Sequence, residues 1–274
     1  MAILTVSEDN VNQGAGWGQF DVSEGSTFRW RMGELTLSAF RTSSEWQIGY
    51  HHEEDKTKAS PATPLSLDDS LQTGSASNID RYLLGKTDQI LRLVPVLADR
   101  SVVSRPIAPL HLMAGGEIHI YVRTPLWIRV EVGEPPKVLQ EIPAVRLSDS
   151  WFGPNTIQGE MCYASRTFAR LTMADVPSRS DLAVTRVLIR NNSGRTTTFE
   201  QLSLPVPYLA LFASKNDILW TQGVTLTSAR NGKTVEVKVG DGAPVVADNA
   251  KRLSEPRQML ERNTLTKGWS LIFG

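Results

Sequence analysis

Two carboxylates flank a short turn in the stretch RLSDSWFGPNTIQGEMCY, residues 146–163. Asp149 precedes the Gly-Pro-Asn turn and Glu160 follows it. Enzymes that hydrolyse sugars use two carboxylic side chains together, one of them as a general acid. Spacing along the chain leaves the distance between these two open. In the alternative interpretation, which we favour, Asp149 caps the turn and Glu160 forms an ion pair with Arg146 or Arg166.

The same stretch holds the single cysteine of the chain and two adjacent aromatic residues. Cys162 would be a nucleophile only beside a base that lowers its pKa, and the sequence indicates no such base, so we predict a buried thiol. An aromatic platform for a sugar could include Trp127, Trp151, Phe152 and Tyr163, although most tryptophans of a β protein pack in the core. Neighbouring residues of a strand face opposite sides, so Trp151 is the candidate for a ligand or protein contact.

Common signatures of catalysis are missing from the sequence. It has no Gly-x-Ser-x-Gly turn, no phosphate-binding Walker loop, no His-Glu-x-x-His and no Cys-x-x-Cys. The run His51-His52-Glu53-Glu54-Asp55 has metal-binding side-chain types, but adjacent histidines of a strand point apart, which favours a solvated strand end. We therefore predict no catalytic residue, no metal site and no cofactor.

Composition limits the classes of partner. Lys plus Arg and Asp plus Glu both number 29, so no net field favours nucleic acid or an anionic membrane. One cysteine excludes an internal disulfide and fits a reducing compartment. No stretch approaches the roughly 18 apolar residues of a membrane span, and the first residues lack a basic leader. We expect a cytoplasmic protein that does not insert into membranes.

Two-residue alternation of apolar and polar side chains dominates the chain and predicts an all-β fold. It runs through residues 28–39, where Gly33-Glu34 favours a type II′ hairpin turn, and resumes at 46–50. The segments 118–122 and 126–132 continue it on either side of Pro125. Asn231-Gly232 is typical of a type I′ turn between two further strands.

We predict two packed β-sandwich-like modules, divided near Glu134-Pro135-Pro136, with a short C-terminal helix. Residues 1–135 form an N-terminal β module with a polar loop at 53–78. Residues 136–274 form an immunoglobulin-like module in which Ser254 caps a helix that runs to about Arg262. The segment from Trp269 to Phe273 is either a final strand or an exposed hook for a partner.

Three stretches carry a resemblance to a known family: YVRTPLWIRVEVG, EIPAVRLSDSWFGPNTIQGEMCYASRTFARL and AVTRVLIRNNSG. They resemble an uncharacterised archaeal and bacterial family, a domain of unknown function. Its most distinctive positions here are 123–127 and 146–153. The resemblance spans most of the chain, provides no catalytic residue to carry over, and implies a cytoplasmic partner of a membrane protein such as a mechanosensitive channel.

Binding rather than catalysis is the function that we predict, with a protein partner or self-association. Trp151 and Phe152 fill the seam between the modules, and the charged side chains beside them satisfy one another. One alternative is a cytoplasmic enzyme on sugars, in which Asp149 and Glu160 do acid and base work. Another is a regulatory subunit that docks through the face of Tyr121, Arg123, Trp127 and Arg129 or through its C-terminus. The predicted binding residues are Arg123, Trp127, Arg146, Asp149, Trp151 and Glu160.

Overall fold

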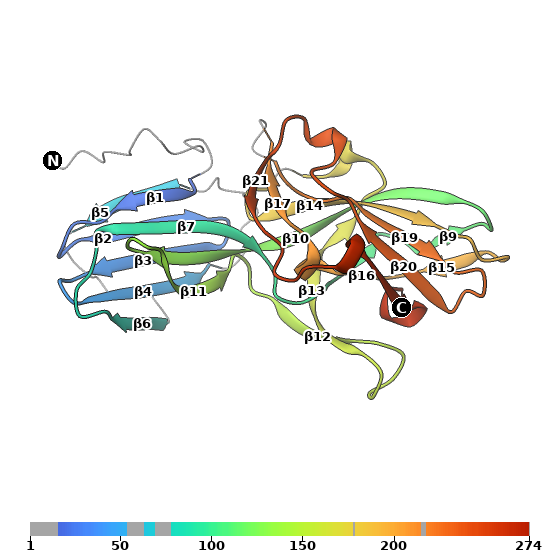
Figure 1. Ribbon diagram of the computed structural model, residues 1–274, viewed down its shortest axis with the longest axis horizontal. Coiled ribbons are helices and arrows are strands. Elements are labelled where there is room, and N and C mark those ends of the chain that lie inside the picture. Colours follow the sequence, from blue (N-terminus) through green and yellow to red (C-terminus); the bar gives the residue numbers. More distant parts are fainter. Residues whose placement is uncertain (1–15, 54–62, 69–77, 178, 215–217, 274) are drawn as a thin grey trace. The chain divides into compact units, whose positions relative to one another are not determined.

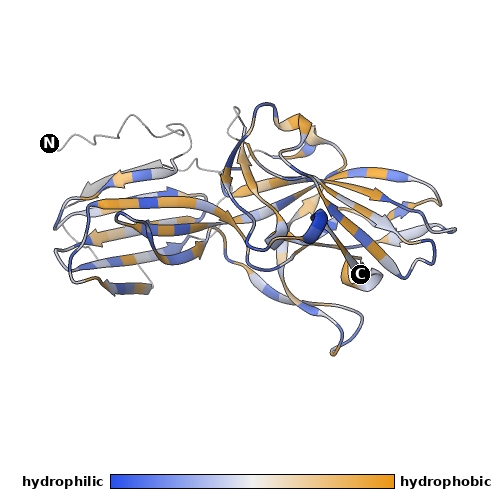
Figure 2. Ribbon diagram, in the orientation of Figure 1, coloured by the Kyte–Doolittle hydropathy of each residue, from blue (hydrophilic) through white to orange (hydrophobic). Residues whose placement is uncertain are grey.

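The chain is all β, as predicted. The computed structural model describes residues 16–53, 63–68, 78–177, 179–214 and 218–273 (Figure 1). In this part of the chain, every helical segment is a 3-10 turn of three residues. Apolar and polar colours alternate along many strands (Figure 2), because successive side chains of a strand face opposite sides of its sheet.

Two compact units divide the chain, and each draws on several segments. The first contains residues 1–96, 126–146 and 179–181, and the second contains 97–125, 147–178 and 182–274. Strand β10 (Glu117–Val132) contributes its first nine residues to the second unit and its last seven to the first. The predicted boundary at 134–136 lies inside the first unit, in the turn between β10 and β11 (Lys137–Pro143).

The first unit contains an antiparallel five-stranded sheet in the order β5-β2-β3-β4-β6. Its buried side chains include Trp30 and Trp46, both fully buried. A second layer of pairing joins β1, β7, the end of β10, and β11. The bounds are β1 Gly18–Asp21, β2 Thr27–Met32, β3 Leu35–Arg41, β4 Glu45–His52, β5 Thr63–Asp68, β6 Asn78–Leu83 and β7 Ile90–Leu97.

In the second unit, the first half of β10 pairs with β14, which pairs in turn with β18 and β19. A separate four-stranded sheet has the order β12-β13-β8-β16, and β9 pairs with β15. The bounds are β8 Val102–Pro106, β9 Leu110–Leu112, β12 Ser148–Phe152, β13 Glu160–Ala169, β14 Leu182–Arg190, β15 Thr197–Phe199, β16 Leu202–Leu204, β17 Leu211–Ala213, β18 Leu219–Thr221, β19 Val224–Ser228, β20 Thr234–Val239, β21 Lys251–Ser254 and β22 Thr264–Gly268.

Two predicted turns have different outcomes. Gly33 has φ +56 and begins the two-residue turn between β2 and β3, as the alternation predicts. The type I′ turn at Asn231-Gly232 is wrong, because only Gly232 has positive φ (+65). A longer loop closes this hairpin, in which Gly232 N–H donates to Ala229 O and Ala229 N–H donates to Thr234 O. The glycine provides the one left-handed residue that such a loop needs.

The segments expected to break the β pattern also differ from the prediction. The polar stretch 53–78 contains β5, which pairs with the edge of β2, while 54–62 and 69–77 lie outside the described residues. The predicted C-terminal helix is wrong: Ser254 ends β21, and only the 3-10 turn Glu261–Asn263 lies in that region. Positive φ at Arg262 and Asn263 prevents a continuous α-helix there.

The last residues are neither a regular strand nor an exposed hook. Trp269–Leu271 form a 3-10 turn after β22. Phe273 makes an isolated β-bridge with Leu202 and is 1% exposed. Its ring lies 5.3 Å from that of Phe199 and 4.5 Å from that of Trp269. The segment is therefore packed onto its own unit.

Candidate functional site

The hairpin β12–β13 carries three of the six predicted binding residues, Asp149, Trp151 and Glu160. Its antiparallel register pairs Asp149 with Tyr163 and Trp151 with Met161. Because directly opposed residues share a face, these four side chains lie on one side of the hairpin. Phe152 and Glu160 form another pair and lie on the other side. In Figure 1 the hairpin extends away from the other strands of its unit.

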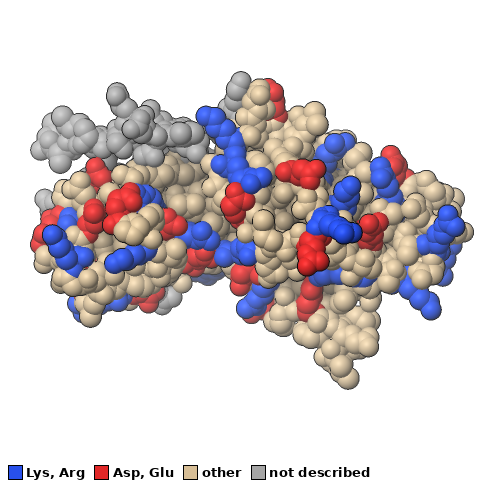
Figure 3. All heavy atoms as spheres, viewed as in Figure 1, with Lys and Arg blue, Asp and Glu red and all other residues tan. Residues whose placement is uncertain are grey.

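The outer face of the hairpin is apolar and exposed. Trp151 and Met161 are each 45% exposed, and Ile157 in the connecting loop is 89% exposed. Residues 150–159 contain no charged side chain, and the tip of the hairpin shows neither blue nor red side chains in Figure 3. We name Trp151, Ile157 and Met161 the hairpin patch.

Trp151 is fixed in place even though it is exposed. Its indole Nε1–H donates to Asn155 O at 2.8 Å. The ring also lies directly on Gly159, where an added Cβ would meet Trp151 Cε2 at 2.6 Å. Asn155 Oδ1 accepts the backbone N–H groups of Ile157 and Gln158 at 2.9 and 2.7 Å, which orders the loop. The aromatic surface is thus preorganised on a structured turn.

The inner face anchors the hairpin in its unit. Phe152 is 3% exposed and Cys162 is fully buried, and both pack with Val103 of β8. The predicted buried thiol agrees with this placement. Burial and the negative charge of Glu160 raise the pKa of Cys162 to about 11. A protonated thiol is a poor nucleophile, so this environment gives Cys162 the chemistry of a core residue.

Glu160 forms an ion pair that the sequence did not indicate. Lys267 Nζ, from β22, donates to both carboxylate oxygens of Glu160 at 2.8 Å. Ser203 Oγ, from β16, lies 3.4 Å from one of them. The side chains of Glu160 and Lys267 are 32% and 18% exposed, so the pair is partly withdrawn from water. It ties the start of β13 to two strands that follow much later in the chain.

Asp149 belongs to a different charged group on the outer face. Arg100 Nη1 donates to Asp149 Oδ1 at 3.2 Å. The Arg100 guanidinium also lies over the ring of Tyr163, 5.2 Å from its centre, and the Tyr163 hydroxyl donates to Asp99 at 2.9 Å. Burial, followed by the hydrogen bond to Asp99, raises the pKa of Tyr163 to about 12. This group borders the hairpin patch with both signs of charge.

The two carboxylates of the proposed sugar-cleaving pair point to opposite sides of the hairpin. Asp149 shares its face with Trp151, whereas Glu160 shares its face with Phe152. Three register steps also separate their positions along the strands, or roughly 10 Å at the rise of a strand. Each is already paired with a cation, so this geometry does not assemble an acid and a base around one substrate.

The other predicted binding residues lie elsewhere. Arg146 belongs to the first unit and donates to His52 O at 3.0 Å, so the expected contacts among Arg146, Asp149 and Glu160 do not occur in the described residues. Arg123 and Trp127 are each 7% exposed. A docking surface built on those two side chains is therefore closed, because their β10 positions face packed neighbours rather than water.

No three side chains of His, Cys, Asp or Glu among the described residues are grouped to hold a metal ion. His52 Nε2 lies 2.8 Å from Pro143 O, and burial lowers the pKa of His52. His51 Nε2 lies 3.8 Å from Glu53 on the other side of β4. The adjacent histidines point apart, as the strand geometry predicts.

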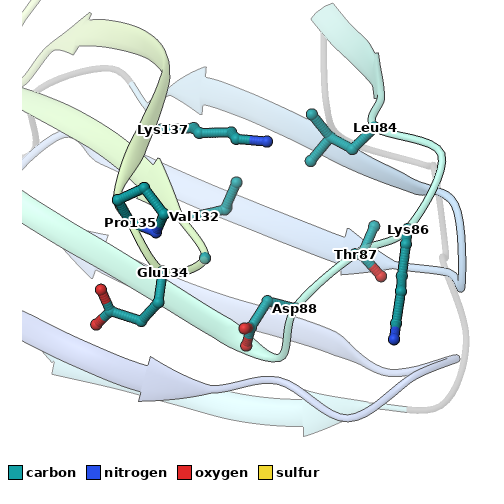
Figure 4. Close-up of a pocket in the computed structure, with 9 residues that line it drawn as sticks. Leu84, Lys86, Thr87, Asp88, Val132, Glu134, Pro135 and Lys137 are labelled. Atoms are coloured by element: carbon teal, nitrogen blue, oxygen red, sulfur yellow. The ribbon is translucent and has the colours of Figure 1, made fainter.

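A pocket of about 210 Å³ opens between the ends of β6 and β10 in the first unit. It is smaller than the roughly 300–1,000 Å³ of most ligand sites. Figure 4 shows Lys137 extending toward Leu84, with Asp88 and Glu134 opposite and Lys86 directed away. Two lysines and two carboxylates cancel in charge, and Glu134 pairs with Arg92. The pocket has no convergent group of one chemistry.

Sequence reasoning did not find Arg100 or Lys267, the charged partners of the hairpin. Arg100 precedes Asp149 by 49 residues, and Lys267 follows Glu160 by 107. Both lie in ordinary polar positions, so only the fold identifies them. The adjacent aromatic residues Trp151 and Phe152 were the one available signal, and in the structure Trp151 is 45% exposed whereas Phe152 is 3% exposed.

Comparison with known proteins agrees with the resemblance found in the sequence. The model of a family described as "Protein of unknown function (DUF432)" matches residues 16–273. No curated protein and no solved structure matches the chain. The described residues contain no helix long and apolar enough to cross a membrane. Because the family match covers nearly the whole chain, the protein belongs to the DUF432 family.

Proposed function

We propose that this protein acts by binding a protein partner through the hairpin patch, and that the partner supplies an extended segment. The supporting observation is the exposed, hydrogen-bonded Trp151 beside Met161 on a hairpin without charge at its tip. Aromatic and methionine side chains that are exposed and already ordered are enriched at the centres of protein interfaces. The predicted cytoplasmic location is part of this proposal.

The outer edge of β12 favours an extended segment as the occupant. In the four-stranded sheet, β12 is the terminal strand, and no described strand pairs with its other edge. Free backbone groups at a sheet edge can pair with an incoming strand, while side-chain contacts select its sequence. At the opposite edge, β16 is covered by the bridge between Leu202 and Phe273. The sheet is thus open on the side of the hairpin patch.

The exposed area of Trp151 sets the scale of the interaction. A tryptophan buries roughly 200 Å² in a full contact, and 45% of this residue is exposed, which leaves about 90 Å² to cover. At about 25 cal/mol per Å² that area contributes about 2 kcal/mol, or roughly a 30-fold change in Kd. Trp151→Ala should therefore weaken the complex strongly while the hairpin stays anchored by its inner face.

The test is photo-crosslinking in the native cells. A photoreactive benzophenone amino acid replaces Trp151 in one strain and Met259, which is 83% exposed, in a matched strain. Mass spectrometry of the crosslinked product then identifies the protein in contact. We expect one partner to crosslink from position 151 and not from position 259. In a third strain, Met161→Ala beside the crosslinker should reduce the yield, whereas Met259→Ala should leave it unchanged.

Two results would overturn the proposal. Equal crosslinking from both positions would indicate random collisions, and crosslinks only to a second copy of this chain would indicate self-association instead. The family resemblance implied a membrane-channel partner, and the identity of the crosslinked protein tests that implication as well. The sugar-enzyme alternative is not proposed, because Asp149 and Glu160 lie on opposite faces of the hairpin.

A further inference from the structure

A row of cationic side chains crosses one face of β10 and β14 in the second unit. Tyr121 of β10 pairs with Arg186 of β14 on one side. On its other side it pairs with Arg170, through Tyr121 N–H to Arg170 O at 2.7 Å and Arg170 N–H to Tyr121 O at 2.9 Å. Directly opposed residues share a face, so Arg170, Tyr121 and Arg186 lie side by side.

Two further cationic or polar side chains extend this row along β10. His119 and Arg123 lie two residues before and after Tyr121, on the same face of the strand. Arg123 is 7% exposed and its Nη1 lies 3.4 Å from Pro177 O. Arg186 Nη2 lies 3.1 Å from His119 Nε2. We name Arg170, Arg186, Tyr121 and His119 the arginine cluster.

Donors of the arginine cluster are buried without acceptors. The Nε atoms of Arg170 and Arg186 and the Nδ1 atom of His119 are enclosed and have no hydrogen-bond partner among the described residues. A guanidinium only donates, so His119 Nε2 accepts from Arg186 and the ring proton of the neutral imidazole lies on Nδ1. Burial and the charge of Arg186 lower the pKa of His119, which favours this neutral form. Every unsatisfied atom is thus a donor.

Nearby carboxylates do not neutralise the cluster. Glu117, at the start of β10, pairs with Arg190 at 3.1 Å, and Asp175 accepts from Thr172 Oγ at 2.6 Å. In the part of the chain that the structure describes, neither Arg170 nor Arg186 forms an ion pair. Unpaired charge that is partly withdrawn from water costs free energy, which a bound anion would recover.

We propose that the arginine cluster binds a phosphate group. The register places both arginines and Tyr121 on one face, and a phosphate presents enough oxygen atoms to accept from several of their donors together. The apolar cluster of Val184, Phe212 and Trp220, against which Tyr121 packs, holds the platform rigid. The phosphate belongs either to a small soluble molecule or to the headgroup of an anionic lipid. This site is independent of the hairpin patch.

Isothermal titration with inorganic phosphate and with pyrophosphate tests the site on the full chain. The variants Arg170→Gln and Arg186→Gln each remove one cation, and Tyr121→Phe removes only the hydroxyl. Arg190→Gln is the matched control, because it removes the same charge from the same strand but from a side chain already paired with Glu117. We expect saturable binding that weakens at least tenfold in the two cluster variants and less than twofold in the control.

Vesicles distinguish the two sources of the phosphate. Flotation with phosphatidylglycerol vesicles, compared with phosphatidylcholine vesicles, reports the lipid headgroup. Binding that weakens in Arg170→Gln and Arg186→Gln, in the titration or in the flotation experiment, supports the site. The experiment in which it occurs identifies the source of the phosphate. Binding that weakens equally in Arg190→Gln would show a general charge effect and overturn the proposal. No saturable binding in both arms, with every variant folded by circular dichroism, would overturn it as well.

Discussion

Replacing Lys267 by methionine is the most direct perturbation of the hairpin's attachment. Methionine keeps most of the aliphatic side chain and removes the ammonium group, so the change isolates the charge. Both oxygens of Glu160 then lose their donor at 2.8 Å, while the Ser203 hydroxyl at 3.4 Å and Cys162 Sγ at 3.9 Å remain near Oε1. Removing the cation leaves a carboxylate that is partly withdrawn from water beside the protonated thiol of Cys162.

The expected loss lies between two limits. Exposed ion pairs contribute about 0–1 kcal/mol, and breaking a fully buried pair costs about 3–5 kcal/mol. With 18% and 32% of the two side chains exposed, we expect Lys267→Met to lower the free energy of unfolding by about 2 kcal/mol. Glu160→Gln alone should also lower the free energy of unfolding, because the Lys267 ammonium, whose side chain is only 18% exposed, then loses its counter-charge. The double variant should be more stable than Lys267→Met alone.

Urea titration of the four proteins in the double-mutant cycle measures these values. Hydrogen exchange of residues 148–163 shows whether the loss is located in the hairpin. A coupling free energy of about 1 kcal/mol or more would agree with the geometry. A cycle with no coupling, or a Lys267→Met variant as stable as the wild type, would refute the reasoning that this pair anchors β13.

Three further predictions concern single positions. Burial and a neighbouring carboxylate raise the pKa of Cys162 to about 11, so its contribution to stability is complete below the unfolded pKa of about 9 and is lost as the pH rises through 11. Urea titrations over this pH range should show a loss of up to about 3 kcal/mol, and Cys162→Ala should remove this pH dependence. Phe152→Ala should lower the free energy of unfolding by about 3–4 kcal/mol and Trp151→Ala by less than about 1 kcal/mol. Equal losses in denaturant titration would contradict the placement of the two side chains on opposite faces of the hairpin. Gly33→Ala, with a Cβ 2.7 Å from a carboxylate oxygen, should lower the Tm more than Gly25→Ala, which meets nothing within 4 Å; equal Tm values would argue against the close approach.

The local sequence pattern predicted the strands because the two-residue alternation depends only on neighbouring residues along the chain. The turn at Gly33 was predicted for the same reason. The sequence pattern predicted two modules but not the segments that each unit contains, because the division of β10 depends on its pairing with β11 and β14, which lie far apart along the chain. The loop at Asn231-Gly232 shows the limit of turn motifs: the dipeptide located the hairpin and not the φ angles of both residues.

Of the three residues of the hairpin patch, the sequence pointed only to Trp151. Trp151 was singled out because it neighbours Phe152, and strand geometry forces one of the two outward. The charged partners could not be found, since Lys267 is remote in sequence from Glu160 and Arg100 from Asp149. The arginine cluster could not be predicted from the sequence either, because Arg170 pairs with Tyr121 only through an isolated β-bridge.

Backbone hydrogen exchange of β12 tests the central proposal most directly. The crosslinking experiment supplies the partner, and exchange of Ser148–Phe152 is then measured with and without it. An extended segment paired to the open edge should slow exchange in β12 and leave the loop around Met259 unchanged, and Trp151→Ala should abolish that protection. Unchanged exchange in β12 with protection elsewhere on the chain would contradict binding through the hairpin.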